Sequence, residues 1–195
     1  MYKNQIYMYL KQCLPLFLLL LLICQANAQF GKNCELRQMK VNLLNPGFEY
    51  EMALGTNTTF DLKVGVQVGL DPLKANVYEE LGFFPAVAGQ YRYYYNFEKR
   101  QQNRRQIYGN SANYVAPAVA AFFPGSSTIG GEEVKGAFGY AGLVTGLQRS
   151  YNSGFNFSVD VGAAYYTGQF EDGIYPVANL SIGWILSEKR WCVGR

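Results

Sequence analysis

Two carboxylates stand two residues apart in the segment Gly47-Phe48-Glu49-Tyr50-Glu51. On an extended strand, alternate residues share a face, which would put Glu49 and Glu51 on one side about 7 Å apart. That spacing lies within the separation of the acid and the base of an inverting glycosidase, about 6.5–9.5 Å. The alternative is that both carboxylates pair with basic side chains in a closed interior, because an unpaired buried charge is costly. We favour this alternative, since the narrow barrel predicted below offers no substrate cleft.

Other catalytic chemistry is limited by composition, because the chain has 195 residues and no histidine. No Ser–His or Cys–His nucleophile and no His-ligated metal site can be built from it. The formal net charge is only +3, which does not indicate a nucleic-acid-binding protein. A hydrophobic content of 49% is too high for a disordered chain. We therefore predict no catalytic residue, no metal site and no cofactor.

A basic run follows Phe97 and contains Lys99, Arg100, Arg104 and Arg105. It could bind lipid phosphates or an acidic partner. The simpler interpretation is a solvated hairpin tip, since charged side chains normally lie outside. With eight strands, this tip would lie on the same side as the two chain ends.

The first 28 residues are predicted to be a secretory signal peptide. They carry two lysines and no acidic residue, followed by an apolar run over residues 14–24 and an Ala-x-Ala site that ends at Ala28. The apolar run of 11 residues is too short to span a bilayer, which needs about 20. Cleavage after Ala28 would leave residues 29–195 as one domain.

The rest of the chain alternates between apolar and polar or small residues, which is typical of β-strands. Every second residue from Phe60 to Leu70 is apolar, and the residues between them are Asp61, Lys63, Gly65, Gln67 and Gly69. Asn45-Pro46-Gly47 is a turn signal that divides the first two strands. We expect a short helix across residues 72–80. The expected strands cover residues 35–44, 47–54, 58–70, 83–96, 111–123, 134–148, 154–167 and 175–188.

The composition of the two faces distinguishes a membrane barrel from a soluble one. A soluble ligand-binding barrel turns its apolar face inward and solvates the other, whereas a membrane barrel reverses this. The non-apolar faces here are rich in Gly, Ala, Ser and Asn with few charges, which suits a narrow lumen better than a solvated surface. Tyrosines near strand ends are typical of an interfacial aromatic girdle; they are Tyr91, Tyr93, Tyr95, Tyr114, Tyr140, Tyr165 and Tyr175.

The segments Lys40–Leu44 and Gly47–Glu51, with the signal peptide and the eight alternating strands, resemble the small outer-membrane β-barrel proteins of Gram-negative bacteria. The resemblance is to the OmpA-like barrel type and to uncharacterised barrel-domain families. It implies an all-β fold, an eight-stranded antiparallel up-and-down transmembrane β-barrel in the outer membrane. It also implies that the partners are outer-membrane lipid and the barrel-assembly machinery; no protein partner can be named.

Charged residues that stand opposite the apolar positions are expected to point into the lumen and to pair there. They are Lys40, Glu49, Glu51, Asp61, Lys63, Arg92 and Asp160.

Two cysteines, Cys34 and Cys192, survive signal cleavage, one near each end of the mature chain. In a barrel with an even number of strands, the start of the first strand and the end of the last lie on the same side. We predict a disulfide between them in the oxidising compartment. Two free thiols remain the alternative, since a disulfide requires Cα atoms within about 7 Å of each other.

Three functions are open at this point. The leading one is a non-enzymatic integral outer-membrane protein with a structural or surface-interaction role. The alternative is a soluble periplasmic or secreted lipocalin-like barrel that binds a small apolar ligand. The third is an outer-membrane lipid-modifying enzyme, for which the absence of histidine excludes Ser–His chemistry.

Overall fold

The structure is a computed structural model, which describes residues 35–70, 81–123, 136–168 and 172–191. The chain divides into two compact units, Met1–Lys32 and Asn33–Arg195, and all described residues belong to the second. The predicted signal peptide with its cleavage site at Ala28, the expected helix over 72–80, and both Cys34 and Cys192 lie outside the described residues.

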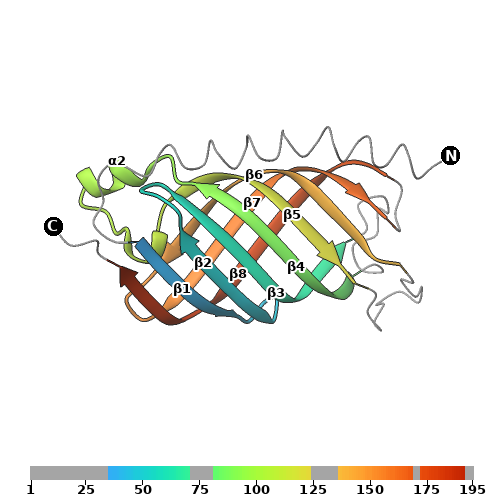
Figure 1. The fold of residues 1–195 in the computed structure, drawn as a ribbon, viewed down its shortest axis with the longest axis horizontal. Helices are drawn as coiled ribbons and strands as arrows, with labels where there is room; N and C mark the ends of the chain where they lie inside the picture. Colours follow the sequence, from blue (N-terminus) through green and yellow to red (C-terminus); the bar gives the residue numbers. More distant parts are fainter. Residues whose placement is uncertain (1–34, 71–80, 124–135, 169–171, 192–195) are drawn as a thin grey trace, which may run out of the picture. The chain divides into compact units, whose positions relative to one another are not determined.

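The described unit consists of eight antiparallel strands that close into a barrel, because β1 pairs with both β2 and β8 (Figure 1). This confirms the prediction of an all-β chain with eight antiparallel strands. The strands are β1 (Glu35–Asn42), β2 (Gly47–Ala53), β3 (Thr58–Leu70), β4 (Leu81–Tyr93), β5 (Asn113–Phe122), β6 (Phe138–Ser150), β7 (Phe155–Thr167) and β8 (Gly173–Trp191).

Strand boundaries differ from the prediction by up to four residues: β6 begins at Phe138 rather than at residue 134, β8 ends at Trp191 rather than at residue 188, and the connection between β4 and β5 is longer. β4 ends at Tyr93 rather than at residue 96, and β5 begins at Asn113 rather than at residue 111. The connection contains a short helix, α2 (Phe97–Gln102), and a 3₁₀ turn, η1 (Tyr108–Asn110). The predicted turn after Asn45 is present, since β1 ends at Asn42 and β2 begins at Gly47.

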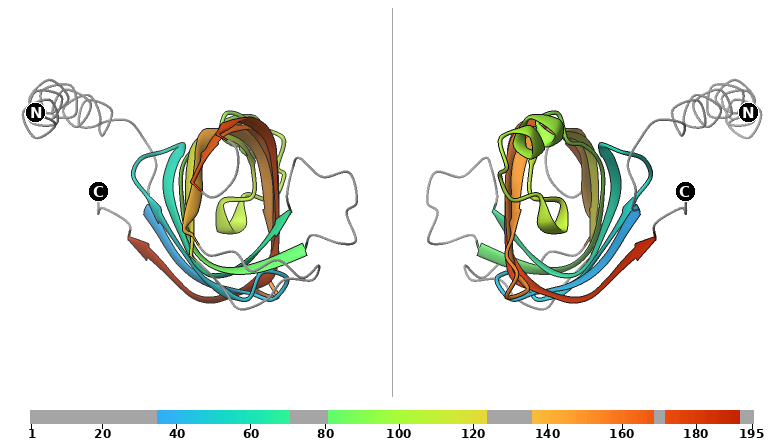
Figure 2. Two further views of the ribbon diagram at one scale, coloured as in Figure 1. Left: turned by 90° about the vertical axis from the view of Figure 1, so that its right-hand side faces the viewer. Right: turned by 90° about the vertical axis from the view of Figure 1, so that its left-hand side faces the viewer.

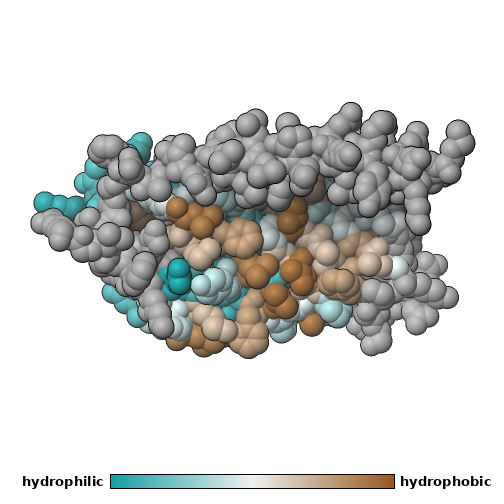
Figure 3. Space-filling view, in the orientation of Figure 1, coloured by the Kyte–Doolittle hydropathy of each residue, from teal (hydrophilic) through white to brown (hydrophobic). Residues whose placement is uncertain are grey.

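Outward positions of the strands carry large apolar side chains. Val64, Val119 and Leu143 are exposed to 48%, 55% and 69%, although all three lie within strands. Figure 3 shows apolar residues spread across the middle of the visible face. Ordinary folded domains bury most such residues, so the outer surface of this ring is unusually apolar.

Tyrosines at the strand ends divide between the two faces. Tyr93, Tyr95 and Tyr165 are exposed on the outer surface. Tyr114 and Tyr140 are buried inside the ring, so the prediction that they belong to an outer aromatic girdle is wrong. Both occupy inward positions of the alternating pattern, where their rings fill space that the alanines of β5 leave free.

The interior away from the chain ends is filled by aromatic rings. Phe122 stacks on Phe138 with 4.7 Å between ring centroids, and Phe84 meets Phe138 edge-on at 5.1 Å. Inward alanines on β4 and β5, among them Ala86 and Ala118, leave room for these rings. Close packing of this kind fills a barrel of eight strands with its own side chains.

The connection between β4 and β5 folds back into the ring at the end where the chain enters and leaves the barrel. Figure 2 shows its η1 turn inside the circle of strands. Gly109 has φ of 55°, and a Cβ there would lie 2.5 Å from the Cβ of Ser150. Only glycine fits this left-handed position so close to β6. We call residues 106–112 the inner plug.

Candidate functional site

The seven predicted lumen residues all point into the ring, from five strands. Lys40 comes from β1, Glu49 and Glu51 from β2, Asp61 and Lys63 from β3, Arg92 from β4 and Asp160 from β7. Six are at most 1% exposed; Lys63, with 12% of its side chain exposed, is the exception. We call this set, together with the polar side chains that bond to it, the lumen network.

Lys40 is the centre of one half of the lumen network. Its Nζ lies 2.8 Å from Glu49 Oε1 and 2.8 Å from Glu51 Oε2. It also donates to Gln148 Oε1 at 3.2 Å. All three donors of the ammonium group are therefore used, and one lysine neutralises part of the charge of two carboxylates.

Arg92 is the centre of the other half. Its Nη2 donates to Asp61 Oδ1 at 3.0 Å, its Nη1 to Gln148 Oε1 at 2.8 Å, and its Nε to Gln90 Oε1 at 2.8 Å. The guanidinium carbon lies 4.8 Å from the ring centroid of Tyr114. A planar guanidinium in this position joins β3, β4 and β6 through fixed donor directions.

Glu51 connects the lumen network to the inner plug. Its Oε1 accepts from Tyr94 Oη and from Asn110 Nδ2, both at 2.8 Å. Gln148 Nε2 donates both to Glu51 Oε2 at 3.0 Å and to the carbonyl of Gly109 at 2.9 Å. The plug is thus held by hydrogen bonds to buried charged groups, which are stronger than neutral ones.

Asp160 is held by neutral donors rather than by a cation. Gln90 Nε2 and Tyr114 Oη donate to its Oδ2 at 3.2 Å and 2.8 Å. Asn179 Nδ2 donates to its Oδ1 at 2.7 Å. The predicted pairing with a basic residue is therefore not present for Asp160 among the described residues. Its inward direction agrees with the prediction.

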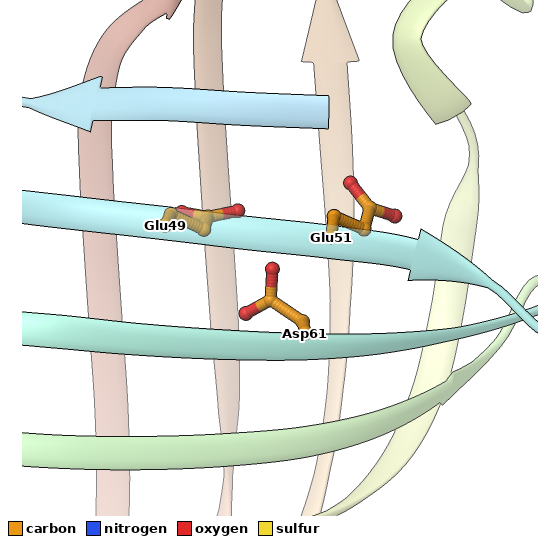
Figure 4. Close-up of side chains that lie close together, drawn as sticks. All are labelled: Glu49, Glu51 and Asp61. Carbon is orange, nitrogen blue, oxygen red and sulfur yellow. The ribbon is translucent and has the colours of Figure 1, made fainter. Parts of the chain in front are cut away.

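The three carboxylates of Glu49, Glu51 and Asp61 bring ligand atoms within 4.8 Å of one another (Figure 4). Lys40 and Arg92 already bind these groups, so positive charge is supplied by the protein itself. The same contacts argue against Glu49 and Glu51 as the acid and the base of a glycosidase. Both glutamates are fully buried and bonded to Lys40, which leaves no access for a sugar or for an attacking water.

Several members of the lumen network were not predicted from the sequence to point inward. They are Gln90, Tyr94, Asn110, Tyr114 and Gln148. Gln90 and Gln148 occupy inward positions in the apolar–polar alternation of β4 and β6. That alternation could have identified them as lumen residues. Asn110 could not be identified in this way, because it lies in a connection whose path depends on the closed ring.

The basic run after Phe97 lies outside the ring, partly on α2. Lys99, Arg104 and Arg105 are exposed, and Arg100 donates to the carbonyl of Gln106 at 2.8 Å. Partial burial and the nearby Arg105 lower the pKa of Arg100. The run is a solvated tip, as the simpler interpretation predicted, and it leads into the inner plug.

A small pocket that is partly open to the outside lies next to the lumen network. Inward residues Asp61, Lys63 and Ser181 line it together with outward residues Phe48 and Val64. This pocket therefore lies where the inner and outer surfaces of the barrel wall meet.

Comparisons with protein-family models, with curated proteins and with solved structures each found no match. Within the described residues, no helix is long and apolar enough to cross a membrane.

Proposed function

We propose that this chain is a non-enzymatic integral outer-membrane β-barrel protein, exported by a signal peptide cleaved after Ala28, with a structural or surface-interaction role. The observation that supports this most strongly is that single strands expose their apolar side chains and bury their charged ones. On β3, Phe60 and Val64 are exposed while Asp61 between them is fully buried. A chain in water would be stabilised by the opposite arrangement, whereas lipid favours this one.

The extent of the apolar outer surface supports a bilayer as its surroundings. β7 carries exposed side chains from Val161 to Tyr165, and β4 carries them from Phe83 to Tyr93. Tyrosines at the ends of these stretches match the aromatic girdles at the two membrane interfaces. Strands of 13 residues, as in β3, β4, β6 and β7, exceed the length of about 9–11 residues that a tilted strand needs to cross.

The interior argues against the lipocalin-like alternative. A carrier of a small apolar ligand needs an apolar cavity, but the middle of this ring contains Lys40, Glu51 and Arg92 in direct contact with other polar groups. Opening a cavity there would break buried ion pairs, at a cost of about 3–5 kcal/mol for each unpaired charge. We therefore prefer a barrel that carries nothing through its centre.

The disulfide between Cys34 and Cys192 belongs to this proposal. The described ladder between β1 and β8 is antiparallel and ends with Glu35 opposite Trp191. Each cysteine is the next residue beyond this pair in the sequence. Directly opposed residues of an antiparallel ladder have Cα atoms about 4.5–5.5 Å apart, within the range that a disulfide needs.

A membrane extraction experiment tests the proposed function. We expect the protein to sediment with outer membranes, to resist extraction at high pH, and to float with lipid vesicles. On a gel in detergent, the unheated barrel should migrate differently from the boiled chain, because the closed hydrogen-bonded ring resists the detergent. A protein that purifies as a soluble monomer without detergent would refute the proposal.

A further inference from the structure

The barrel wall is lower at one place, where the hairpin of β1 and β2 is short. β1 has 8 residues and β2 has 7, whereas the flanking strands β3 and β8 have 13 and 19. A tilted strand needs about 9–11 residues to cross the hydrocarbon layer. The hairpin therefore ends partway up the wall that its neighbours complete.

Above this hairpin, β3 and β8 have no ladder partner on this side among the described residues. The β2–β3 ladder ends at Gly47 opposite Gly65, and the β1–β8 ladder ends at Asn42 opposite Gly183. The turn is tied to both neighbours, since the N–H of Val66 donates to the Pro46 carbonyl at 2.8 Å and that of Leu43 to the Ile182 carbonyl at 2.8 Å. Asn45 Nδ2 also donates to the Leu180 carbonyl at 3.0 Å, and beyond these bonds the described residues 67–70 and 173–179 form no ladder with each other. We call this gap the wall notch.

The sequence of β8 is adapted to an open edge at the wall notch. Backbone groups of a strand alternate between its two neighbours, so Pro176 faces the same side as Ile182, whose carbonyl binds the hairpin. Proline has no N–H and within sheets is confined to edges and bulges. Ile174 and Leu180, on the outer face of the same stretch, are 75% and 43% exposed. The notch therefore opens within the apolar band of the outer surface.

The pocket beside the lumen network lies at the floor of the wall notch. The pocket is lined by Asn45 and Gly47, which stand on either side of Pro46. Val66 and Gln67 from β3 and Asn179 from β8 complete the lining. The pocket thus begins at the notch and reaches the inward side of β3.

The polar end of the pocket contains one buried carboxylate oxygen that accepts no N–H or O–H hydrogen bond from the described residues, and one partly exposed donor. Asp61 Oδ2 is buried and has no hydrogen-bond partner among the described residues. Lys63 Nζ donates to Ser181 Oγ at 2.9 Å, and 12% of the Lys63 side chain is exposed. A hydroxyl can donate to the first and accept from the second. The lysine disfavours a cationic head group and the carboxylate an anionic one.

We propose that the wall notch is a lateral entrance through which an uncharged long-chain amphiphile with a hydroxyl head group binds from the membrane. Its hydroxyl reaches Asp61 and Lys63, and its chain lies along Phe48 and Val64 on the outer surface. The inference rests on the proposed location of the barrel in a membrane, because only there does the notch face hydrocarbon.

Photolabelling of the purified protein in phospholipid nanodiscs tests this binding. The probe is a hexadecanol with a diazirine on its chain, and adducts are mapped by mass spectrometry. We expect adducts to concentrate on residues 64–67 and 179–182 and to be displaced by unlabelled hexadecanol. Hexadecanoic acid and hexadecylamine should displace the probe about tenfold less well.

Two matched variants place a large ring on the outer surface. Val66→Trp covers the mouth of the notch, and Val119→Trp puts the same ring on β5, away from it. We expect labelling at the notch to fall about tenfold in the first variant and to stay unchanged in the second.

The outcomes separate the two proposals. Adducts spread evenly over Val119, Leu143 and the notch would leave the membrane location standing and overturn the entrance. Equal displacement by the acid or the amine would contradict selectivity for a hydroxyl head group. A co-purifying peptide paired with the β3 edge would show that the notch binds a peptide and not an amphiphile. A protein that fails to enter nanodiscs, or that is labelled nowhere on its outer surface, would overturn the membrane location itself.

Discussion

Replacing Lys40 with methionine tests whether the lumen network stabilises the barrel. The substitution keeps most of the length of the side chain but removes an ammonium group that lies 2.8 Å from an oxygen of both Glu49 and Glu51. The two carboxylates would then face each other in a fully buried site with no cation between them.

The expected loss follows from the cost of an uncompensated buried charge. Removing one partner of a buried ion pair destabilises a protein by about 3–5 kcal/mol. Arg92 stays within 3.7 Å of Glu49 and retains part of the compensation, so we expect about 4 kcal/mol. With a denaturant slope of about 2 kcal/mol per molar urea, the unfolding midpoint should fall by about 2 M.

Urea unfolding of the barrel in lipid vesicles measures this change. Trp184, which is 40% exposed on the outer surface, reports loss of the apolar environment through its emission, and the heat-dependent gel shift gives a second readout. Lys99→Met on α2 is the matched control, and its free energy of unfolding should stay within about 0.5 kcal/mol of wild type.

A compensating variant separates charge from packing. Adding Glu49→Gln and Glu51→Gln to Lys40→Met removes the stranded charges, so most of the lost stability should return. If the single variant unfolds at the wild-type midpoint, or if the triple variant is no more stable than the single one, the lumen network does not stabilise the barrel through charge pairing.

Three other changes test the face assignment and the chain ends. Asp61→Leu should strand the guanidinium of Arg92 and lower the unfolding free energy by about 3–5 kcal/mol, and Asp61→Asn, which also removes the charge, should lose a comparable amount; an Asp61→Asn variant that unfolds in urea at the wild-type midpoint would contradict the charge argument. Val119→Arg should cost about 2–4 kcal/mol in vesicles, because it places a charge on the outer surface; no loss would contradict a lipid-facing position. Mass spectrometry of the unreduced, alkylated protein should find one peptide linked through Cys34 and Cys192, and two alkylated thiols would exclude the disulfide.

Strand number and face direction could be predicted from the sequence because they depend on local alternation. A period of two assigns each residue to one face, and the chain repeats that period over most of its length. Asp61 and Val64 could therefore be placed on opposite sides without knowledge of any contact. The turn after Asn45 was equally local, since the Pro-Gly pair ends a strand wherever it occurs.

The tertiary structure decided which inward groups meet. Gln148 bonds to Lys40 although 108 residues separate them, and it also bonds to the plug carbonyl of Gly109. Such contacts depend on the register of strands and on closure of the ring, which alternation alone does not specify. The same holds for the inner plug and for the wall notch. Each depends on how far one connection or hairpin extends relative to strands distant in the sequence, so only the closed barrel determines them.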